Sequence, residues 1–393
     1  MLTSFALIFV GSIIMKVLLE KFKVPALIGY MLIGIVLGPQ VFGLIDQRIL
    51  DMSTDLRQIA LIIILTRAGL SLDLSTLKKV GRQAIFLSFL PACFEIVGVI
   101  IIATFIFSMD IFQAGVLGSV LAAVSPAVVV PRMLKIMKEG YGSKQGIAQM
   151  IMAGVSVDDI FVIVMFSAFT SIVKSGKFSL LSFVSIPISI MLGIMVGLQM
   201  GKVVANIIKQ LKLTDVYAVI FLISVSFLLL QLQTQMEAYI PFSGLIAIMS
   251  TGLGLRQRDK VTSKSCEQMF TKLWDVAQIL LFALVGCAVQ FQYIETVGGY
   301  ALLIILFGLC FRMLGVFISV SGNTLNKQEK LFVGVAYMPK ATVQAAIGAL
   351  PLSMGLPFGA QILAVAATSI ITTAPIGAIL IDATYKKLLH KEV

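Results

Sequence analysis

Charge, cysteine and histidine are all scarce in this 393-residue chain. Only 12% of the residues are charged and 59% are hydrophobic, which is too little charge to cover a soluble protein of this length. The four cysteines lack the paired spacing of a metal site and three lie in apolar runs, so we expect packing residues and no disulfide framework. The single histidine, His390, lies in the C-terminal tail, where we expect it to be solvated. The first segment lacks the basic start of a signal peptide, and we expect it to be retained as a membrane span.

Apolar runs make up most of the remaining sequence, and about 20 helical residues suffice to cross the roughly 30 Å hydrocarbon core of a bilayer. Hydropathy therefore predicts an all-α polytopic membrane protein with about 13 transmembrane helices, joined by connections too short for a soluble domain. The expected spans are 3–19, 24–39, 55–72, 83–108, 110–134, 146–173, 180–207, 214–232, 238–255, 273–290, 297–320, 329–351 and 358–381.

Basic residues alternate from loop to loop. One set of loops carries most of the lysines and arginines, and the opposite set holds only Arg48, Arg57, Lys174 and Lys177. Because Lys and Arg gather on the cytoplasmic side, we expect the N-terminus outside and the C-terminus in the cytoplasm of a plasma (inner) membrane. The net charge of +11 is then a topology signal, and we expect no nucleic-acid partner. The basic loops contain Lys21, Lys23, Lys78, Lys79, Arg82, Lys135, Lys138, Lys144, Lys202, Lys209, Lys212, the run 256–272, Lys327, Lys330, Lys386, Lys387 and Lys391.

A faint internal repeat relates spans that are seven apart. An odd offset inverts the second copy in the membrane, as in the inverted repeats of secondary transporters. The matched stretches are Pro25 to Gly29 with Pro241 to Gly244, Arg67 to Leu72 with Leu284 to Val289, and Ser125-Pro126 and Pro131 with Pro339-Lys340.

Prolines close to mid-membrane in both copies predict two discontinuous helices. Proline removes a backbone donor and frees a carbonyl, and unwound backbone within a bilayer must lie inside the protein or line a wet cavity. The stretch from Ala123 to Ala127 offers free carbonyls and the Ser125 hydroxyl, which are hard oxygen ligands suited to an alkali cation. The alternative is an ordinary proline kink.

Asp158 and Asp159 lie in the middle of the apolar run 147–173. Each carboxylate there costs roughly 2.5–3.5 kcal/mol on insertion scales, and such residues usually mark an ion or proton pathway. Helical neighbours point about 100° apart, so both can edge one cavity without facing each other. A site that holds either protons or a cation is the minimum apparatus for exchange, and the alternative is a structurally paired dyad.

Four further charged residues lie within predicted spans. Lys340 needs a carboxylate partner, for which Asp158 or Asp159 is the natural candidate; alternatively it stabilises the C-terminal carbonyls of a broken helix. Glu95 and Arg312 are again seven spans apart, and we expect a mutual salt bridge that acts as a structural clamp rather than a proton carrier. Arg67 is expected to snorkel to the membrane interface.

These stretches resemble the monovalent cation/proton antiporter superfamily, and most closely its NHA (sodium/hydrogen exchanger-like domain) branch. The resemblance covers nearly the whole chain and rests on Leu65 to Leu70, Val124 to Pro131, Val157-Asp158-Asp159 and Met338 to Gln344.

The resemblance implies an inverted-repeat sodium/proton antiporter fold with two crossing broken helices, assembled as a homodimer in membrane lipids. Asp159 would be the main cation and proton carrier, Asp158 its neighbour, Ser125 a further Na⁺ ligand and Lys340 the exchangeable paired charge. A Glu–Arg pair like Glu95–Arg312 is connected with electrogenicity in that branch. The implied division is 1–82 and 213–296 for dimerisation, 83–173 and 297–393 for the core, and 174–212 for a linker helix.

Our leading functional hypothesis is a transporter, not an enzyme, that exchanges Na⁺, and also Li⁺, for protons by elevator-type alternating access. It needs no cofactor, since Na⁺, Li⁺ and H⁺ are its substrates. The alternatives are a K⁺/H⁺ antiporter, a sodium-coupled organic-anion symporter of the same fold, and a channel. An intramembrane aspartyl protease is disfavoured because its two carboxylates would have to come from facing helices.

Overall fold

The computed structural model describes residues 1–22, 24–71, 82–142, 145–175, 180–236, 242–289, 291–322 and 325–391, with side chains except at 175, 180–187 and 291–297. Several residues used above lie outside this part of the chain: Lys23, Leu72, Lys78, Lys79, Lys144, Lys177 and Pro241.

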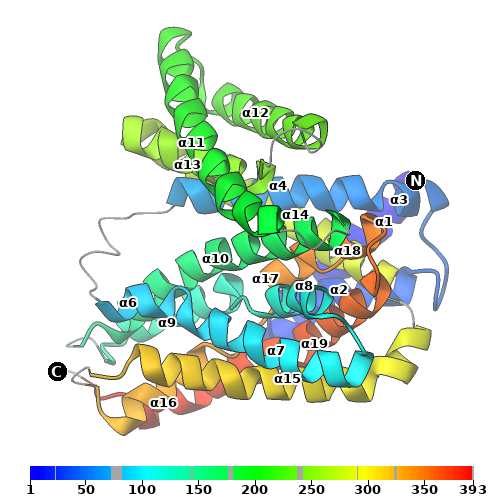
Figure 1. Cartoon of the computed structure of the whole chain (residues 1–393), viewed down its shortest axis with the longest axis vertical. Coiled ribbons are helices and arrows are strands. Elements are labelled where there is room, and N and C mark those ends of the chain that lie inside the picture. The colour runs from blue at the N-terminus through cyan, green and yellow to red at the C-terminus, as the bar shows by residue number, and fades with distance from the viewer. Residues whose placement is uncertain are drawn as a thin grey trace. The chain divides into compact units, whose positions relative to one another are not determined.

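The regular structure of the described residues is helical (Figure 1), apart from one isolated antiparallel bridge between Tyr141 and Lys391. The helices are α1 (Leu2–Lys21), α2 (Ala26–Leu37), α3 (Gln47–Asp51), α4 (Ser53–Ser71), α6 (Arg82–Leu87), α7 (Leu90–Phe107), α8 (Ile111–Leu121), α9 (Pro126–Lys138), α10 (Ile147–Ser175), α11 (Leu180–Gln210), α12 (Asp215–Met236), α13 (Gly244–Arg258), α14 (Lys260–Ala288), α15 (Phe291–Ser319), α16 (Lys327–Ala336), α17 (Thr342–Ile347), α18 (Leu350–Ser353) and α19 (Gly359–Leu388).

Nine helical segments in the described part of the chain are long and apolar enough to cross a membrane, and two shorter apolar helices accompany them. The prediction of an all-α polytopic membrane protein is therefore confirmed, whereas the number of about 13 spans stays a prediction.

Contacts divide the chain into two compact units. Unit 1 comprises Met1–Thr54, Leu74–Thr170 and Ile279–Val393, and unit 2 comprises Asp55–Asp73 and Ser171–Gln278. All of the candidate site residues named above lie in unit 1. The division into dimerisation, linker and core parts stays a prediction.

Glycines bring helices close together in both units. In unit 1 a Cβ added at Gly34 of α2 would overlap the carbonyl of Ala283 in α14, and one at Gly286 would overlap the carbonyl of Met31. In unit 2 a Cβ at Gly69 of α4 would overlap the carbonyl of Met249 in α13. Small residues of this kind let membrane helices approach closely. Under the seven-span offset, α2 corresponds to α13 and α4 to α14. The close pair α2–α14 therefore corresponds to the close pair α13–α4, as an inverted repeat requires.

Both predicted helix breaks are present in unit 1. In the first break, α8 ends at Leu121 and the chain becomes helical again as α9, with Pro126 in its first turn. In the second break, α16 ends at Ala336 and the chain becomes helical again as α17 at Thr342. Pro131 does not break its helix, contrary to expectation, but lies inside α9. A proline within a membrane helix is tolerated because neighbouring groups satisfy the freed carbonyl.

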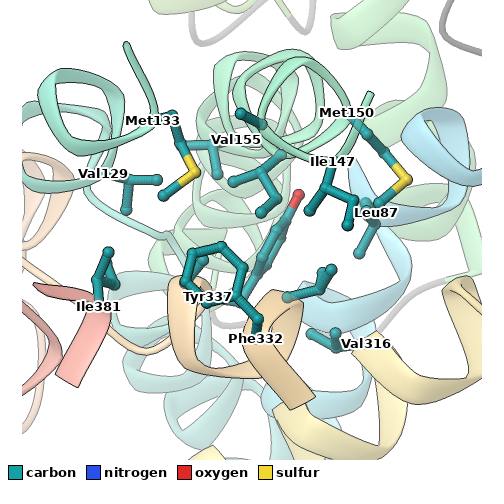
Figure 2. Close-up of a cluster of buried hydrophobic side chains, with 14 of the residues drawn as sticks. Leu87, Val129, Met133, Ile147, Met150, Val155, Val316, Phe332, Tyr337 and Ile381 are labelled. Atoms are coloured by element: carbon teal, nitrogen blue, oxygen red, sulfur yellow. The ribbon is translucent and has the colours of Figure 1, made fainter. Parts of the chain in front are cut away.

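A buried apolar cluster packs beside the second break (Figure 2). Tyr337, the first residue of that break, lies among Leu87, Val155, Val316 and Phe332, which come from four other helices. The tyrosine is fully buried, and a Cβ at Gly154 of α10 would overlap its hydroxyl oxygen. The second break is therefore anchored against α10 at Gly154, about one helical turn before Asp158.

Candidate ion-binding site

The two helix breaks meet. Ser125 N–H, in the first break, donates to the carbonyl of Pro339 in the second at 2.8 Å. Lys340 N–H donates to Thr373 Oγ1 of α19 at 3.0 Å. The unwound segments therefore hold each other and α19 through backbone groups that a continuous helix would have used internally.

Three carbonyls at the C-terminal end of α8 accept hydrogen bonds from side chains. Lys340 Nζ donates to Leu121 at 2.6 Å, and Gln344 Nε2 donates to Leu121 at 3.2 Å and to Ala123 at 2.9 Å. Arg312 Nη1 donates to the carbonyl of Ala122. Two of these donors are cations, which complement the partial negative charge at a helix C-terminus.

This pairing corrects one expectation from the sequence. The Ala123 carbonyl is bound by Gln344, so it is not one of the free oxygens expected for a cation. Proline did free backbone groups here, but neighbouring side chains satisfy them because a buried carbonyl without a partner is costly.

Four charged side chains form a continuous chain of ion pairs, and each is fully buried. Lys340 Nζ lies 2.6 Å from Glu95 Oε1, Arg312 Nη1 lies 2.7 Å from Glu95 Oε2, and Arg312 Nη2 lies 3.0 Å from Asp158 Oδ2. Arg312 Nε also donates to the carbonyl of Tyr337 at 2.8 Å. The signs alternate along the chain and sum to zero, which offsets the cost of burying each charge.

The expected partner of Lys340 was wrong. The lysine pairs with Glu95 rather than with Asp158 or Asp159. Glu95 reaches both cations because its two carboxylate oxygens face different partners: Oε1 forms the ion pair with Lys340, and Oε2 accepts a hydrogen bond from Arg312. The expected contact between Glu95 and Arg312 is present, but as the middle of a longer chain.

Asp158 and Asp159 lie in different surroundings. Asp158 Oδ2 accepts from Arg312 and also from the N–H of Val124 at 2.9 Å, and the residue is fully buried. Asp159 is 8% exposed, and among the described residues it forms no ion pair and its Oδ1 has no hydrogen-bond partner. Asp159 is therefore the aspartate with an uncommitted carboxylate.

Several other buried oxygens lack a partner within the described residues. Ser125 Oγ lies in the first break, Thr342 Oγ1 is on the first residue of α17 after the second break, and Asp158 Oδ1 is on α10. Ser125 precedes α9 without capping it, so its hydroxyl is not used by the helix. Uncommitted hydroxyl and carboxylate oxygens are the donor types that hard cations prefer.

Sequence reasoning missed Thr342, Gln344 and Thr373. Thr342 and Gln344 lie two and four residues after Lys340, so their place beside a predicted helix break was the available signal. Thr373 lies in an apolar span with no charge nearby, and hydropathy does not separate it from the other residues of that span. His390 is exposed and Arg67 is partly buried, both outside this network.

Comparison with known proteins identifies the family. The family model described as "Sodium/hydrogen exchanger, transmembrane" matches residues 5–387. The chain belongs to the sodium/hydrogen exchanger family. This is a family of membrane transporters rather than enzymes, and this exchanger-family chain is a multi-pass membrane protein.

The relatives of this exchanger-family chain include animal proteins. Sodium/hydrogen exchanger 9B2 of Xenopus tropicalis is 33% identical over 353 residues, which cover 86% of this chain and 64% of the relative. Sodium/hydrogen exchanger 9B1 of Homo sapiens is 31% identical over 406 residues, which cover 98% of this chain and 78% of the relative. The chain thus spans less than two thirds of the first of these proteins.

Among solved structures, the sodium proton antiporter MjNhaP1 from Methanocaldococcus jannaschii is similar in fold. The TM-score is 0.81 at 20% identity, and the match covers 98% of this chain and 99% of that one. The prediction of an antiporter fold is therefore confirmed.

Proposed function

We propose that this chain exchanges a monovalent cation, Na⁺ and also Li⁺, for protons across the plasma membrane. The observation that carries the proposal is the uncommitted carboxylate of Asp159 beside a network whose other charges are paired. Membership of the sodium/hydrogen exchanger family supports the choice of substrates.

Asp159 is the carrier in this proposal. It binds either a proton or the cation, and each displaces the other because both need the same carboxylate. Ser125 Oγ and Asp158 Oδ1, which have no partner among the described residues, supply further oxygen ligands for the cation. Asp158 remains fixed by Arg312 and by the N–H of Val124.

The charge balance favours an exchange of one cation for one proton. Lys340, Glu95, Arg312 and Asp158 sum to zero in their paired form, and each charge is held by at least one partner. If these four charges remain constant, only the ion bound to Asp159 changes. That ion, a proton or a monovalent cation, brings one positive charge in either case.

Alternating access follows an elevator scheme in which the core rises and falls against a dimerisation part within a homodimer. Leak is prevented if only the protonated or cation-loaded core can cross, since a bare carboxylate is costly to move through the bilayer. The N-terminus lies outside and the C-terminus in the cytoplasm.

The competing readings are less well supported. An organic-anion symporter would use Lys340 to attract its substrate, but Glu95 and the Leu121 carbonyl already occupy that ammonium. A protease would need a proton shared between facing carboxylates, whereas both aspartates are on α10 and one is bound by Arg312. Potassium in place of sodium remains the alternative substrate.

The experiment is proton movement in proteoliposomes reported by a pH-sensitive dye. Addition of Na⁺ or Li⁺ should move protons without any organic substrate, and K⁺ should act weakly. Proton movement with K⁺ alone would support the potassium alternative, and movement only in the presence of an organic anion would contradict the proposal.

A further inference from the structure

The peptide bond between Ala123 and Val124 is held on both edges. Its carbonyl accepts from Gln344 Nε2 at 2.9 Å, and its N–H donates to Asp158 Oδ2 at 2.9 Å. The carbonyl and the N–H of a trans peptide point in opposite directions, so Gln344 and Asp158 lie on opposite edges of one peptide plane. Rotation of that plane would turn a carbonyl oxygen towards the Asp158 carboxylate.

The amide of Gln344 has one orientation in which it can make these bonds. Both of its N–H groups are used, one on Ala123 and one on Leu121, and exchange of its oxygen and nitrogen would set an acceptor against two acceptors. Its Oε1 is buried without a partner among the described residues, and the side chain is 1% exposed. The two carbonyls therefore fix the amide, and the amide in turn fixes the peptide.

Gln344 differs in charge from the other donors that bind this segment. Lys340 and Arg312 also donate to carbonyls at the end of α8, but both belong to the chain of ion pairs that ends at Asp158. Gln344 carries no charge, so its hold on the peptide does not depend on the charge of the neighbouring carboxylates.

We propose that Gln344 is a positioning residue for the cation site. It keeps the Val124 N–H directed at Asp158 and the Ala123 carbonyl turned away, so that the cation meets side-chain oxygens rather than a backbone carbonyl. This inference rests on the proposed cation exchange, and it adds a residue that sets cation affinity and selectivity without touching the cation.

The test is Gln344→Met, which keeps the length of the side chain and removes both donors. The half-saturating Na⁺ concentration should rise about tenfold, because only a fraction of the molecules would keep the peptide in the competent orientation. The ratio of half-saturating Na⁺ to Li⁺ concentrations should change by about threefold or more, because the freed carbonyl alters the ligand set.

Gln149→Met is the matched control. Gln149, like Gln344, has an Oε1 without a partner among the described residues, but it is only partly buried and lies in the first turn of α10. Its substitution should leave both the affinity and the ratio unchanged.

A cation titration of the melting temperature in detergent gives a second readout. Gln344→Met with wild-type half-saturation and a wild-type ratio would overturn the proposal, as would a variant altered only in melting temperature or maximal rate. If Gln344→Met does not fold, Gln344→Glu, which keeps the shape, replaces it; failure of both to fold would assign Gln344 to folding and also overturn the proposal. Absence of cation-driven proton movement in the wild type would contradict the proposed function instead, and the melting titration would still test Gln344.

Discussion

The adjacent aspartates on α10 differ in how much they contribute to the stability of the protein. Asp158 binds Arg312 and the first helix break, whereas Asp159 has no ion pair within the described residues. Asp158→Asn should therefore lower the melting temperature in detergent, because it removes a buried negative charge from beside Arg312. Asp159→Asn should leave the melting temperature close to wild type or raise it, because it replaces an unpaired buried carboxylate by a neutral amide. The reverse order of melting temperatures would contradict this assignment.

Arg312 is the residue on which the charge chain depends most. It binds Glu95, Asp158 and the carbonyls of Ala122 and Tyr337. Arg312→Met should cost about 3–5 kcal/mol of stability, because it leaves buried carboxylates without their counter-charge. Equilibrium unfolding in detergent measures this loss.

Arg132→Met is the control for that loss. Arg132 lies in the same unit and its Nε is 3.2 Å from Asp382 Oδ2, but both side chains are partly exposed, at 16% and 24%. Because this pair keeps some contact with solvent, Arg132→Met should cost less than Arg312→Met. Equal losses from Arg312→Met and Arg132→Met would show that burial of the network has no special role.

Elements that carry a strong local signal could be predicted from the sequence. Pro126 and Pro339 predicted both helix breaks, because proline removes a backbone donor, although Pro131 shows that a proline can also lie inside a membrane helix. The start of α14 could not be predicted, since the expected span 273–290 begins well after the helix itself at Lys260. Residues 260–272 are polar, and hydropathy detects apolar sequence rather than helix.

Close packing between α11 and α13 depends on three glycines spaced four residues apart. Each of Gly193, Gly197 and Gly201 faces a backbone carbonyl of α13 or of the residue before it. Gly197→Leu should prevent folding of unit 2 or lower its melting temperature strongly, because its side chain would overlap the Ala247 carbonyl. Gly299→Leu in α15 is the control, since a Cβ there meets nothing within 4 Å, and similar yields of folded protein for both variants would contradict this account.

The N-terminal end of α14 is capped by Asp259. Its carboxylate accepts from the backbone N–H of Thr262, the Thr262 hydroxyl and the N–H of Val261, and these bonds lower the pKa of Asp259 below its usual range. Asp259→Ala should cost about 1 kcal/mol at pH 7, the usual value of an N-cap. Because the folded pKa lies below the unfolded one, this contribution is complete above about pH 4 and is lost as the pH falls through the folded value.

Melting temperatures between pH 7 and pH 3 check this dependence. The difference between wild type and Asp259→Ala should narrow at the acidic end. Asp259→Asn serves as control because asparagine is a good N-cap that does not titrate. The difference in melting temperature between Asp259→Asn and Asp259→Ala should therefore stay the same from pH 7 to pH 3. A difference in melting temperature between wild type and Asp259→Ala that widens on acidification would contradict the lowered pKa of Asp259.

Across the whole molecule, the sequence predicted which polar residues lie buried in the helices better than how they pair. Proline position and hydropathy marked Ser125, Asp158, Asp159, Lys340, Glu95 and Arg312 as candidates, and the structure brings the two breaks and the four paired charges together in unit 1. The pairing of Lys340 with Glu95 could not be predicted, because these residues are 245 positions apart and several carboxylates were available. Three-dimensional packing, not local sequence, selects among such partners.

The charge chain connects this arrangement to the transport cycle. A neutral set of four buried charges can move through the membrane region at lower cost than an unbalanced one. If one cation exchanges for one proton on Asp159, as we propose, the exchange moves no net charge. The initial rate of exchange should be the same with and without an imposed membrane potential.

The most direct test of the central claim, that Asp159 is the single carrier, is dye-reported proton movement in proteoliposomes on addition of Na⁺, with wild type and Asp159→Asn measured side by side. We expect Na⁺-driven proton movement by the wild type and none by Asp159→Asn, although the variant folds. Proton movement that survives in Asp159→Asn would contradict it.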